Sequence, residues 1–154
     1  MLGYNYLDYS VAETNEITKD LMKGQEAFKK LGIEDVHYLR APTGHFDKRL
    51  LEISERFGYT VVHWSVDSKD WTNPGIQKIL QNIDRVDEGD ILLFHASDSA
   101  KQTAEAIPKI LSVIKAKELK LITVSEMLSN SKAHTQEIKS VSYTHLTLPT
   151  MAVV

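Results

Sequence analysis

The sequence predicts an α/β fold in which mostly parallel strands are covered by outer helices. Stretches with helical periodicity alternate along the chain with apolar stretches that are too short to be helices. This alternation favours parallel pairing of the strands, with the helices packed outside the sheet. The 154 residues, 42% of them hydrophobic, have the size and composition of one globular domain.

Two helices and one strand are predicted in the first 58 residues. Ser10 is a candidate N-cap for the first helix, and Gly32 stands where a left-handed C-terminal cap belongs. The apolar residues of this helix are Ile17, Leu21, Phe28 and Leu31. Residues 36–40 predict a strand, and Asp47 begins a second helix that ends before Gly58.

Two more strands and a third helix follow. Residues 60–64 are rich in β-branched and aromatic side chains, which is typical of a strand. Asn73 followed by Pro74 predicts the N-cap and the first turn of a helix. The apolar residues of this helix are Ile76, Ile79, Leu80 and Ile83. The apolar run 91–94 is too short for a helix and predicts a strand buried on both faces.

The last predicted elements are a helix, a strand and a short helix. Ser99 is the expected N-cap of a helix that continues to about Lys117. Its inward-facing residues are expected to be Ala104, Ile107, Ile110, Leu111 and Ile114. Residues 119–124 predict the final strand, and Ser125 is the expected cap of the short helix.

The C-terminal segment differs from the rest of the chain. We assign residues 1–128 to the folded domain and expect residues 129–154 to be a disordered tail, because no apolar period continues there. Residues 141–150 fit no element of the predicted fold and resemble one reading frame of a transposon adapter used for sequencing libraries. We therefore expect this stretch to be a cloning or assembly scar.

Charge and composition exclude several classes of protein. The net charge is −3 and neither sign is collected into a block, so we expect no nucleic-acid partner. The absence of cysteine excludes disulfides and thiolate zinc clusters. No apolar run approaches the ~20 residues of a membrane span, and residues 1–5 lack the build of a signal peptide. The composition leaves the oligomeric state open.

Three polar clusters follow predicted strands. Residues 40–44 follow the first strand, residues 67–71 the second and residues 95–98 the third. Loops at the carboxyl ends of parallel strands meet at one edge of a sheet. We therefore expect the three clusters to converge around a single hollow of about the size of a sugar.

Each candidate residue also has a purely structural interpretation. His95 suits proton transfer near neutral pH, and Asp70 or Asp67 could fix its tautomer. A histidine at a strand end is, however, more often simply buried and hydrogen-bonded. An arginine near two aspartates, as Arg40 is, usually forms a structural ion pair, and Trp71 belongs to the core by default. The prediction of a site depends on the three clusters together.

The clusters resemble the motifs of the polysaccharide deacetylase family, the NodB-like enzymes of carbohydrate esterase family 4. Arg40–Gly44 matches Arg-Pro-Pro-x-Gly with Ala41 as a departure, Asp67–Trp71 matches Asp-x-x-Asp-Trp, and Leu93–His95 matches Leu-x-His. The longer runs 63–67 and 95–106 resemble the sporulation branch of the family, the PdaB type. The resemblance extends to about Leu128 and implies a partial, distorted β/α barrel.

The resemblance also implies roles for the matching residues. His95 would be the general acid for the departing amine, Asp70 would orient its ring, and Arg40 would hold the catalytic base. The implied substrate-binding residues are Thr43, Trp71 and Leu93.

The metal half of the family's site has no match. In the family a divalent metal such as zinc is held by an aspartate and two histidines, and a second aspartate activates a water molecule. Leu2 and Tyr6 occupy the two histidine positions, and the paired aspartates would lie upstream of Met1. We therefore expect no metal or other cofactor for this chain and interpret it as an N-terminally truncated domain.

Two functions are compatible with these residues. The first is an N-deacetylase that hydrolyses the acetamide C–N bond of a peptidoglycan-type amino sugar, inactive in this chain without the metal half. The second is a catalytically degenerate glycan-binding or structural protein of spore envelope formation. In both cases the expected partner is a cell-wall glycan, and the full-length parent is expected outside the cytoplasm or in the spore envelope.

Overall fold

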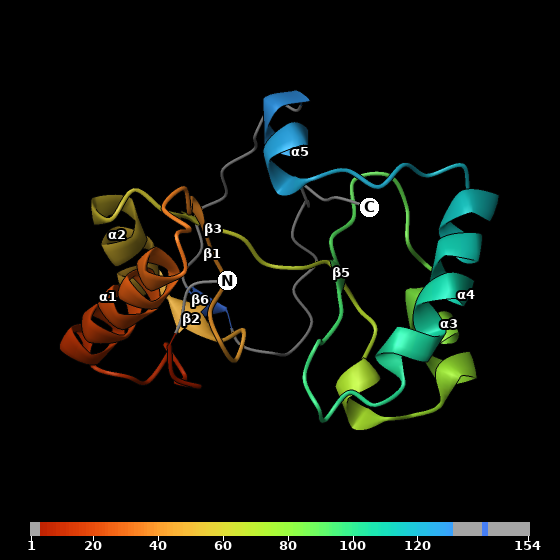
Figure 1. Cartoon of the computed structure of the whole chain (residues 1–154), viewed down its shortest axis with the longest axis horizontal. Coiled ribbons are helices and arrows are strands. Elements are labelled where there is room, and N and C mark those ends of the chain that lie inside the picture. The colour runs from red at the N-terminus through yellow and green to blue at the C-terminus, as the bar shows by residue number, and fades with distance from the viewer. Residues whose placement is uncertain (1–3, 131–139, 142–154) are drawn as a thin grey trace. The chain divides into compact units, whose positions relative to one another are not determined.

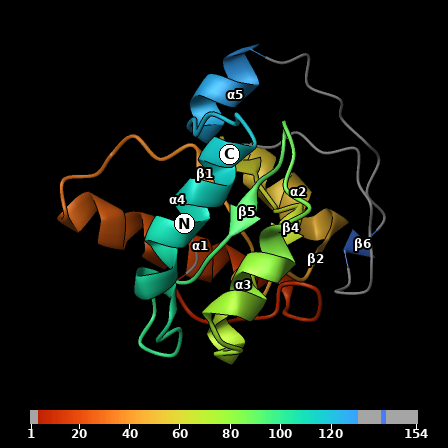
Figure 2. The same cartoon turned by 90° about the vertical axis from the view of Figure 1, so that its right-hand side faces the viewer.

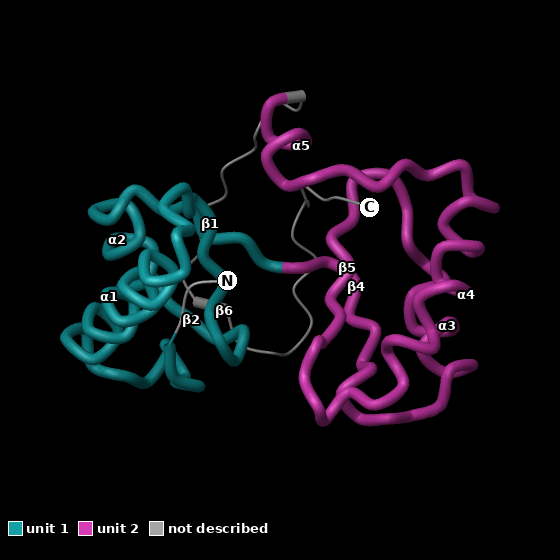
Figure 3. Tube along the Cα trace, viewed as in Figure 1, with its two compact units in different colours: residues 1–63, 136–146 teal, residues 64–135, 147–154 magenta. Residues whose placement is uncertain are grey.

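The structure is a computed structural model that describes residues 4–130 and 140–141 (Figure 1). The chain divides into two compact units, residues 1–63 with 136–146 (unit 1) and residues 64–135 with 147–154 (unit 2), as Figure 3 shows. Each unit has its own helices, strands and apolar core.

Unit 1 combines two helices with short strands. In chain order its described elements are α1 (Thr14–Lys30), β1 (Tyr38–Leu39), β2 (Phe46–Asp47), α2 (Lys48–Arg56), β3 (Thr60–Val61) and β6 (Ser140–Val141). β1 and β3 run parallel, whereas β2 and β6 are antiparallel. β6 lies in the segment expected to be a tail, and residues 131–139 and 142–154 of that segment lie outside the described residues.

The core of unit 1 forms between α1, α2 and the strands. Ile17 and Leu21 on α1, and Leu50 and Ile53 on α2, are buried and lie one helical turn apart. Each helix therefore presents one apolar stripe to the core. The other buried members of this core are Tyr9, Leu39, Ala41, Phe46 and Tyr59.

A buried carboxylate fastens the N-terminal segment of unit 1 to α1. Asp20 is 1% exposed and accepts hydrogen bonds from the backbone N–H groups of Tyr4 and Asn5 at 2.9 and 2.8 Å. The Asn5 side-chain amide and the Tyr9 hydroxyl also donate to it, both at 2.6 Å. Because a buried carboxylate needs donors to replace water, these bonds hold residues 4–9 against the helix.

Unit 2 is built around a second parallel strand pair. In chain order its described elements are β4 (Val66–Asp67), the 3-10 turn η1 (Asp70–Thr72), α3 (Ile76–Ile83), β5 (Leu92–Leu93), α4 (Thr103–Ala116) and α5 (Val124–Asn130). Figures 1 and 2 show α3 and α4 on the same side of the β4–β5 pair. The buried residues of its core are Val66, Ile79, Ile83, Val86, Ala106, Ile110 and Ile114.

The predicted fold class is confirmed, since each unit pairs parallel strands and covers them with helices. Two predicted helix ends are also confirmed. Asp47 accepts a hydrogen bond from the Arg49 N–H at 2.9 Å at the start of α2. Gly32 ends α1 with φ at +74° and donates its N–H to Lys29 O at 3.0 Å. Closure of the strands into a barrel stays a prediction, as does the domain boundary at residue 128.

The predicted start of α1 is wrong. The Ser10 hydroxyl and N–H both bind Asp8 Oδ1, at 2.6 and 2.9 Å, so Ser10 stabilises a turn instead of capping the helix. The helix begins at Thr14, where the Glu16 carboxylate accepts the Glu13 N–H at 3.0 Å. An acidic group in the first turn also complements the helix dipole.

Three other predicted caps and one predicted strand are wrong as well. The caps expected at Asn73, Ser99 and Ser125 do not occupy the N-cap positions of α3, α4 and α5. At α5 the Thr123 hydroxyl oxygen accepts the Glu126 N–H at 3.1 Å. Residues 119–123 are described and form no strand, whereas β4 was not predicted. Strand propensity depends on a pairing partner that local composition does not supply.

α4 buries fewer apolar residues than its sequence predicts. Ile110 and Ile114 are inward as expected, but Ile107 is 39% exposed and Leu111 is 45% exposed. Ala104 is exposed as well. The buried stripe passes through residues three and four apart, so the neighbouring apolar positions fall on its flank.

Among the described residues, no helix is both long and apolar enough to cross a bilayer.

Adjacent substitutions on α4 test which face is buried. Ile110→Ala is expected to lower the free energy of unfolding by about 2–5 kcal/mol, because it opens a cavity in the core. Leu111→Ala is expected to change it by no more than about 0.5 kcal/mol, as for an exposed position. Urea denaturation measures both. Equal losses would contradict this orientation of the helix.

Candidate functional site

A buried carboxylate forms the centre of the candidate site in unit 2. Asp70 is 0% exposed and begins η1, directly after the loop that follows β4. Its Oδ1 accepts the Trp71 N–H at 2.9 Å and contacts the His95 ring at 2.7 Å. Its Oδ2 accepts the His95 N–H at 2.8 Å and the Thr103 hydroxyl at 2.5 Å. Four hydrogen bonds from three segments thus meet on one carboxylate.

His95 is oriented by this carboxylate. It lies two residues after β5, its Nδ1 is 2.7 Å from Asp70 Oδ1, and its side chain is 35% exposed. Because a carboxylate only accepts, the shared proton is on Nδ1, and Nε2 is left to act on a ligand. Of the two aspartates that could orient the ring, the structure selects Asp70. Asp67 Oδ1 instead accepts the Lys69 N–H at 2.8 Å.

The hydrogen bonds keep Asp70 ionised. Burial alone raises the pKa of a carboxyl group. Here the bonds from the Thr103 hydroxyl, the His95 N–H and the His95 ring outweigh burial and hold the pKa of Asp70 below its usual value of 3.8. A fixed negative charge therefore lies against Nδ1 of His95 at neutral pH.

Hydrogen bonds join the loop that carries His95 to the turn that carries Asp70. The Asn73 amide donates to Ser99 O at 2.7 Å, and its Oδ1 accepts the Lys101 N–H at 2.9 Å. Further along, Gly75 donates its N–H to Gln102 Oε1 at 2.8 Å. Asn73 is therefore a bridge between loops and not a helix cap, and its left-handed backbone, with φ at +51°, suits a short polar residue.

Trp71 is not a core residue, contrary to the default expectation. Its side chain is 51% exposed, although its backbone N–H is bound to Asp70. Leu93 in β5 is 9% exposed. The site in unit 2 thus offers an exposed aromatic ring and a buried aliphatic residue.

Arg40 and Thr43 belong to unit 1. Arg40 follows β1, and its guanidinium donates from Nε to Val62 O and from Nη2 to His63 O, both at 3.2 Å. Burial lowers its pKa. Thr43 lies in a turn closed by the Gly44 N–H, which donates to Ala41 O at 3.0 Å. The expected convergence of Arg40 and Thr43 with the residues of unit 2 stays a prediction.

Unit 1 contains a second carboxylate–imidazole pair. His45 Nδ1 lies 2.9 Å from Asp8 Oδ2, and both side chains are 33% exposed. The nearby His63 ring packs edge-on to Phe46 at 5.9 Å. Burial and the charges of Arg40 and His45 lower the pKa of His63 from 6.5 to about 4.

The residues at the family's metal positions do not fit a metal. Tyr6 is 84% exposed, and Leu2, which has no donor atom, lies outside the described residues. In residues 4–130 and 140–141, no group of three His, Cys, Asp or Glu side chains is placed to hold an ion. Since a catalytic zinc site uses three protein ligands, no chemical step is assigned to a metal.

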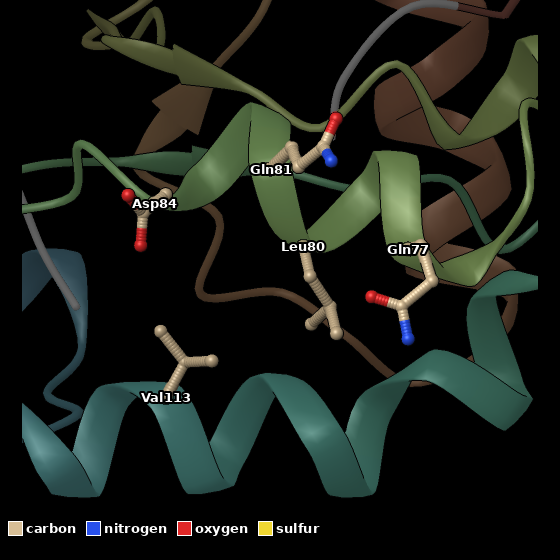
Figure 4. Close-up of a pocket in the computed structure, with 5 residues that line it drawn as sticks. All are labelled: Gln77, Leu80, Gln81, Asp84 and Val113. Carbon is tan, nitrogen blue, oxygen red and sulfur yellow. The ribbon is translucent and has the colours of Figure 1, made fainter.

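Two surface hollows lie elsewhere in the units. In unit 2 a hollow of about 230 Å³ lies between α3 and α4 (Figure 4). It is lined by Gln77, Leu80, Gln81, Asp84 and Val113. In unit 1 a hollow of about 830 Å³ lies beside α1 and has Phe28, Phe57 and Tyr59 among its lining residues. His95 lines neither of them, so the sugar-sized hollow expected there stays a prediction.

Thr103 was missed as a residue of the site. The sequence reasoning considered residues directly after strands, whereas Thr103 begins α4, eight residues after His95. A hydroxyl residue at a helix start was a signal that could have been used, because such residues often satisfy nearby polar groups.

Comparison with known proteins gives consistent matches. The family model described as polysaccharide deacetylase matches residues 2–62. A peptidoglycan-N-acetylglucosamine deacetylase of Bacillus cereus is 30% identical over 128 residues, which are 80% of this chain and 60% of that protein.

Solved structures match over a similar span. A CE4 family pseudoenzyme from Bacillus anthracis is 25% identical with a TM-score of 0.74, covering 80% of this chain and 43% of that one. A mutant described as a CE4 family pseudoenzyme with restored enzymatic activity is 26% identical with the same TM-score of 0.74, covering 80% and 45%. The chain therefore spans less than two thirds of each of these three proteins.

The pH dependence of stability tests the burial of His63. Because its folded pKa of about 4 lies below the unfolded value of 6.5, its contribution is complete above pH 6.5 and is lost as the pH falls toward 4. His63→Gln is expected to flatten the free energy of unfolding over this interval. Urea titrations at several pH values measure it, and an unchanged slope would reject the burial of a neutral ring.

Proposed function

Because this chain belongs to the polysaccharide deacetylase family, we propose that it carries the glycan-binding and acid half of a peptidoglycan-type N-deacetylase. The observation that supports the proposal is the fixed Asp70–His95 pair beside the exposed Trp71. The substrate would be an N-acetylated amino sugar of a cell-wall glycan. This class agrees with the name of the Bacillus cereus relative.

The chemistry assigned to His95 is proton donation to a departing amine. Hydrolysis of the acetamide breaks the C–N bond, adds hydroxyl from water to the acyl carbon and leaves an amine that needs a proton. The donating form of His95 would be the imidazolium, which carries a proton on each nitrogen. It would give the Nε2 proton to the amine, while the ionised Asp70 keeps the other proton on Nδ1. Substrate-binding roles are proposed for Trp71 as an aromatic platform, Leu93 and Thr43, and Arg40 is proposed to hold a base.

Activation of water is not assigned to any residue of this chain. Leu2 and Tyr6 stand where the family has histidines, and the described residues do not supply a three-ligand metal site. We therefore expect the chain to bind glycan without turnover.

The second candidate function is binding or a structural role in spore envelope formation, without catalysis in the parent protein either. The same Leu2 and Tyr6 favour it, and the likeness to a CE4 family pseudoenzyme supports it. The sporulation branch of the family and a location outside the cytoplasm or in the spore envelope belong to this proposal. The intact Asp70–His95 pair favours the first candidate.

Glycan binding and acetate release can be measured on the same sample. With N-acetylated glycan oligomers, calorimetry is expected to detect binding that Trp71→Ala weakens by about tenfold, since stacking by one aromatic ring is worth about 1 kcal/mol or more. Leu111→Ala, which removes another exposed apolar side chain in unit 2, is the matched control and should bind as the unmodified chain does.

An acetate assay, with and without added zinc, tests whether any hydrolysis persists. No release is expected from the chain itself. Release that His95→Ala abolishes would show that hydrolysis persists and would reject the second candidate. If the chain neither binds glycan nor releases acetate, the proposal as a whole is wrong.

A further inference from the structure

Thr103 donates the shortest hydrogen bond that Asp70 receives. Its Oγ1 lies 2.5 Å from Asp70 Oδ2, compared with 2.7–2.9 Å for the other three contacts. The residue is 9% exposed, and Asp70 is fully buried. Because an ionised carboxylate has no proton to give, the Thr103 hydroxyl is the donor.

The two carboxylate oxygens have different partners. Oδ2 binds the Thr103 hydroxyl and the His95 N–H, whereas Oδ1 binds the Trp71 N–H and the His95 ring. The two hydrogen bonds at Oδ2 fix the rotation of the carboxylate about the Cβ–Cγ bond of Asp70. That rotation determines whether Oδ1 faces Nδ1 of the ring.

Thr103 is held by a rigid element. It is the first residue of α4, and Ala106, Ile110 and Ile114 of that helix are in the core of unit 2. The hydroxyl therefore has little freedom to follow Asp70 if the carboxylate turns. The start of a 14-residue helix is in addition favourable for a nearby negative charge.

We propose that Thr103 is a positioning residue whose hydroxyl holds the Asp70 carboxylate in the rotation that keeps the His95 proton on Nδ1 and leaves Nε2 available to a ligand. The proposal rests on the acid role given to His95 above. It adds a third group to the pair, acting through Asp70 and not on the substrate. In a free imidazole no fixed hydrogen-bond partner selects which nitrogen carries the proton. The protein must therefore determine the tautomer.

Ring-nitrogen NMR on the full chain tests the proposal without any need for turnover. Nitrogen shifts of ¹⁵N-labelled His95, recorded well above the ordinary histidine pKa of about 6.5, report which nitrogen carries the proton. Two matched pairs isolate the hydroxyl: Thr and Val share a shape, and Ser and Ala differ only in the oxygen. The control is Thr18→Val, which removes an exposed hydroxyl on α1 that donates to Thr14 O at 2.9 Å.

The hydroxyl-bearing forms, the unmodified chain and Thr103→Ser, are expected to keep the proton on Nδ1. In Thr103→Val and Thr103→Ala the ratio of the two tautomers is expected to shift toward Nε2–H by about tenfold, as the loss of a hydrogen bond to a charged group implies. The Thr18→Val control should match the unmodified chain. If Thr103→Val does not fold, the Ser and Ala pair gives the same comparison.

Identical tautomer ratios in all folded variants would overturn the positioning role, whatever the glycan assays show. A shift confined to the variants without the hydroxyl supports it. If that shift is found while the unmodified chain neither binds glycan nor releases acetate, the positioning role stands and the proposed function fails.

Discussion

The structure of unit 2 depends on keeping a charged carboxylate in a place with no access to water. Transfer of an unpaired carboxylate into such a place is so unfavourable that the group would take up a proton instead. Asp70 avoids this because donors from the turn at Trp71, the loop at His95 and the helix start at Thr103 replace its hydration. The constraint is mutual, because satisfying Asp70 fixes the positions of those three segments.

A similarly buried carboxylate occurs in unit 1 without an imidazole partner. Asp20 on α1 binds donors from Tyr4, Asn5 and Tyr9 and thereby orders the segment that precedes the helix. The difference between the two sites is chemical. Asp20 receives only amides and a hydroxyl, whereas Asp70 also faces an imidazole that can exchange a proton with a ligand. This contrast distinguishes the candidate functional carboxylate from a purely structural one.

Local sequence patterns predicted the helices better than their starts. The apolar periods of α1, α2, α3 and α4 and the caps at Asp47 and Gly32 follow from short-range physical rules. Asn73 shows why other caps failed: its amide is used across a distance of 26 residues, by Ser99, and no local rule anticipates that bond. Leu111 shows that local patterns also fail to predict burial. The sequence pattern does not distinguish an apolar side chain beside the buried stripe of a helix from one within the stripe.

The pairing of Asp70 with His95 was one of two alternatives that the sequence left open, because both aspartates belong to the same polar cluster, residues 67–71. Thr103 was missed because its contact depends on where α4 begins, and the sequence pattern placed that start at Ser99. Arg40 and Thr43 remain tied to the site only through the family resemblance.

The titration of the Asp70 carboxyl group, followed by ¹³C NMR on the folded chain, tests the central constraint most directly. If four donors hold the buried carboxylate in its charged form, the midpoint lies below the ordinary value of 3.8. A midpoint above 3.8, as burial without adequate donors produces, would contradict the account.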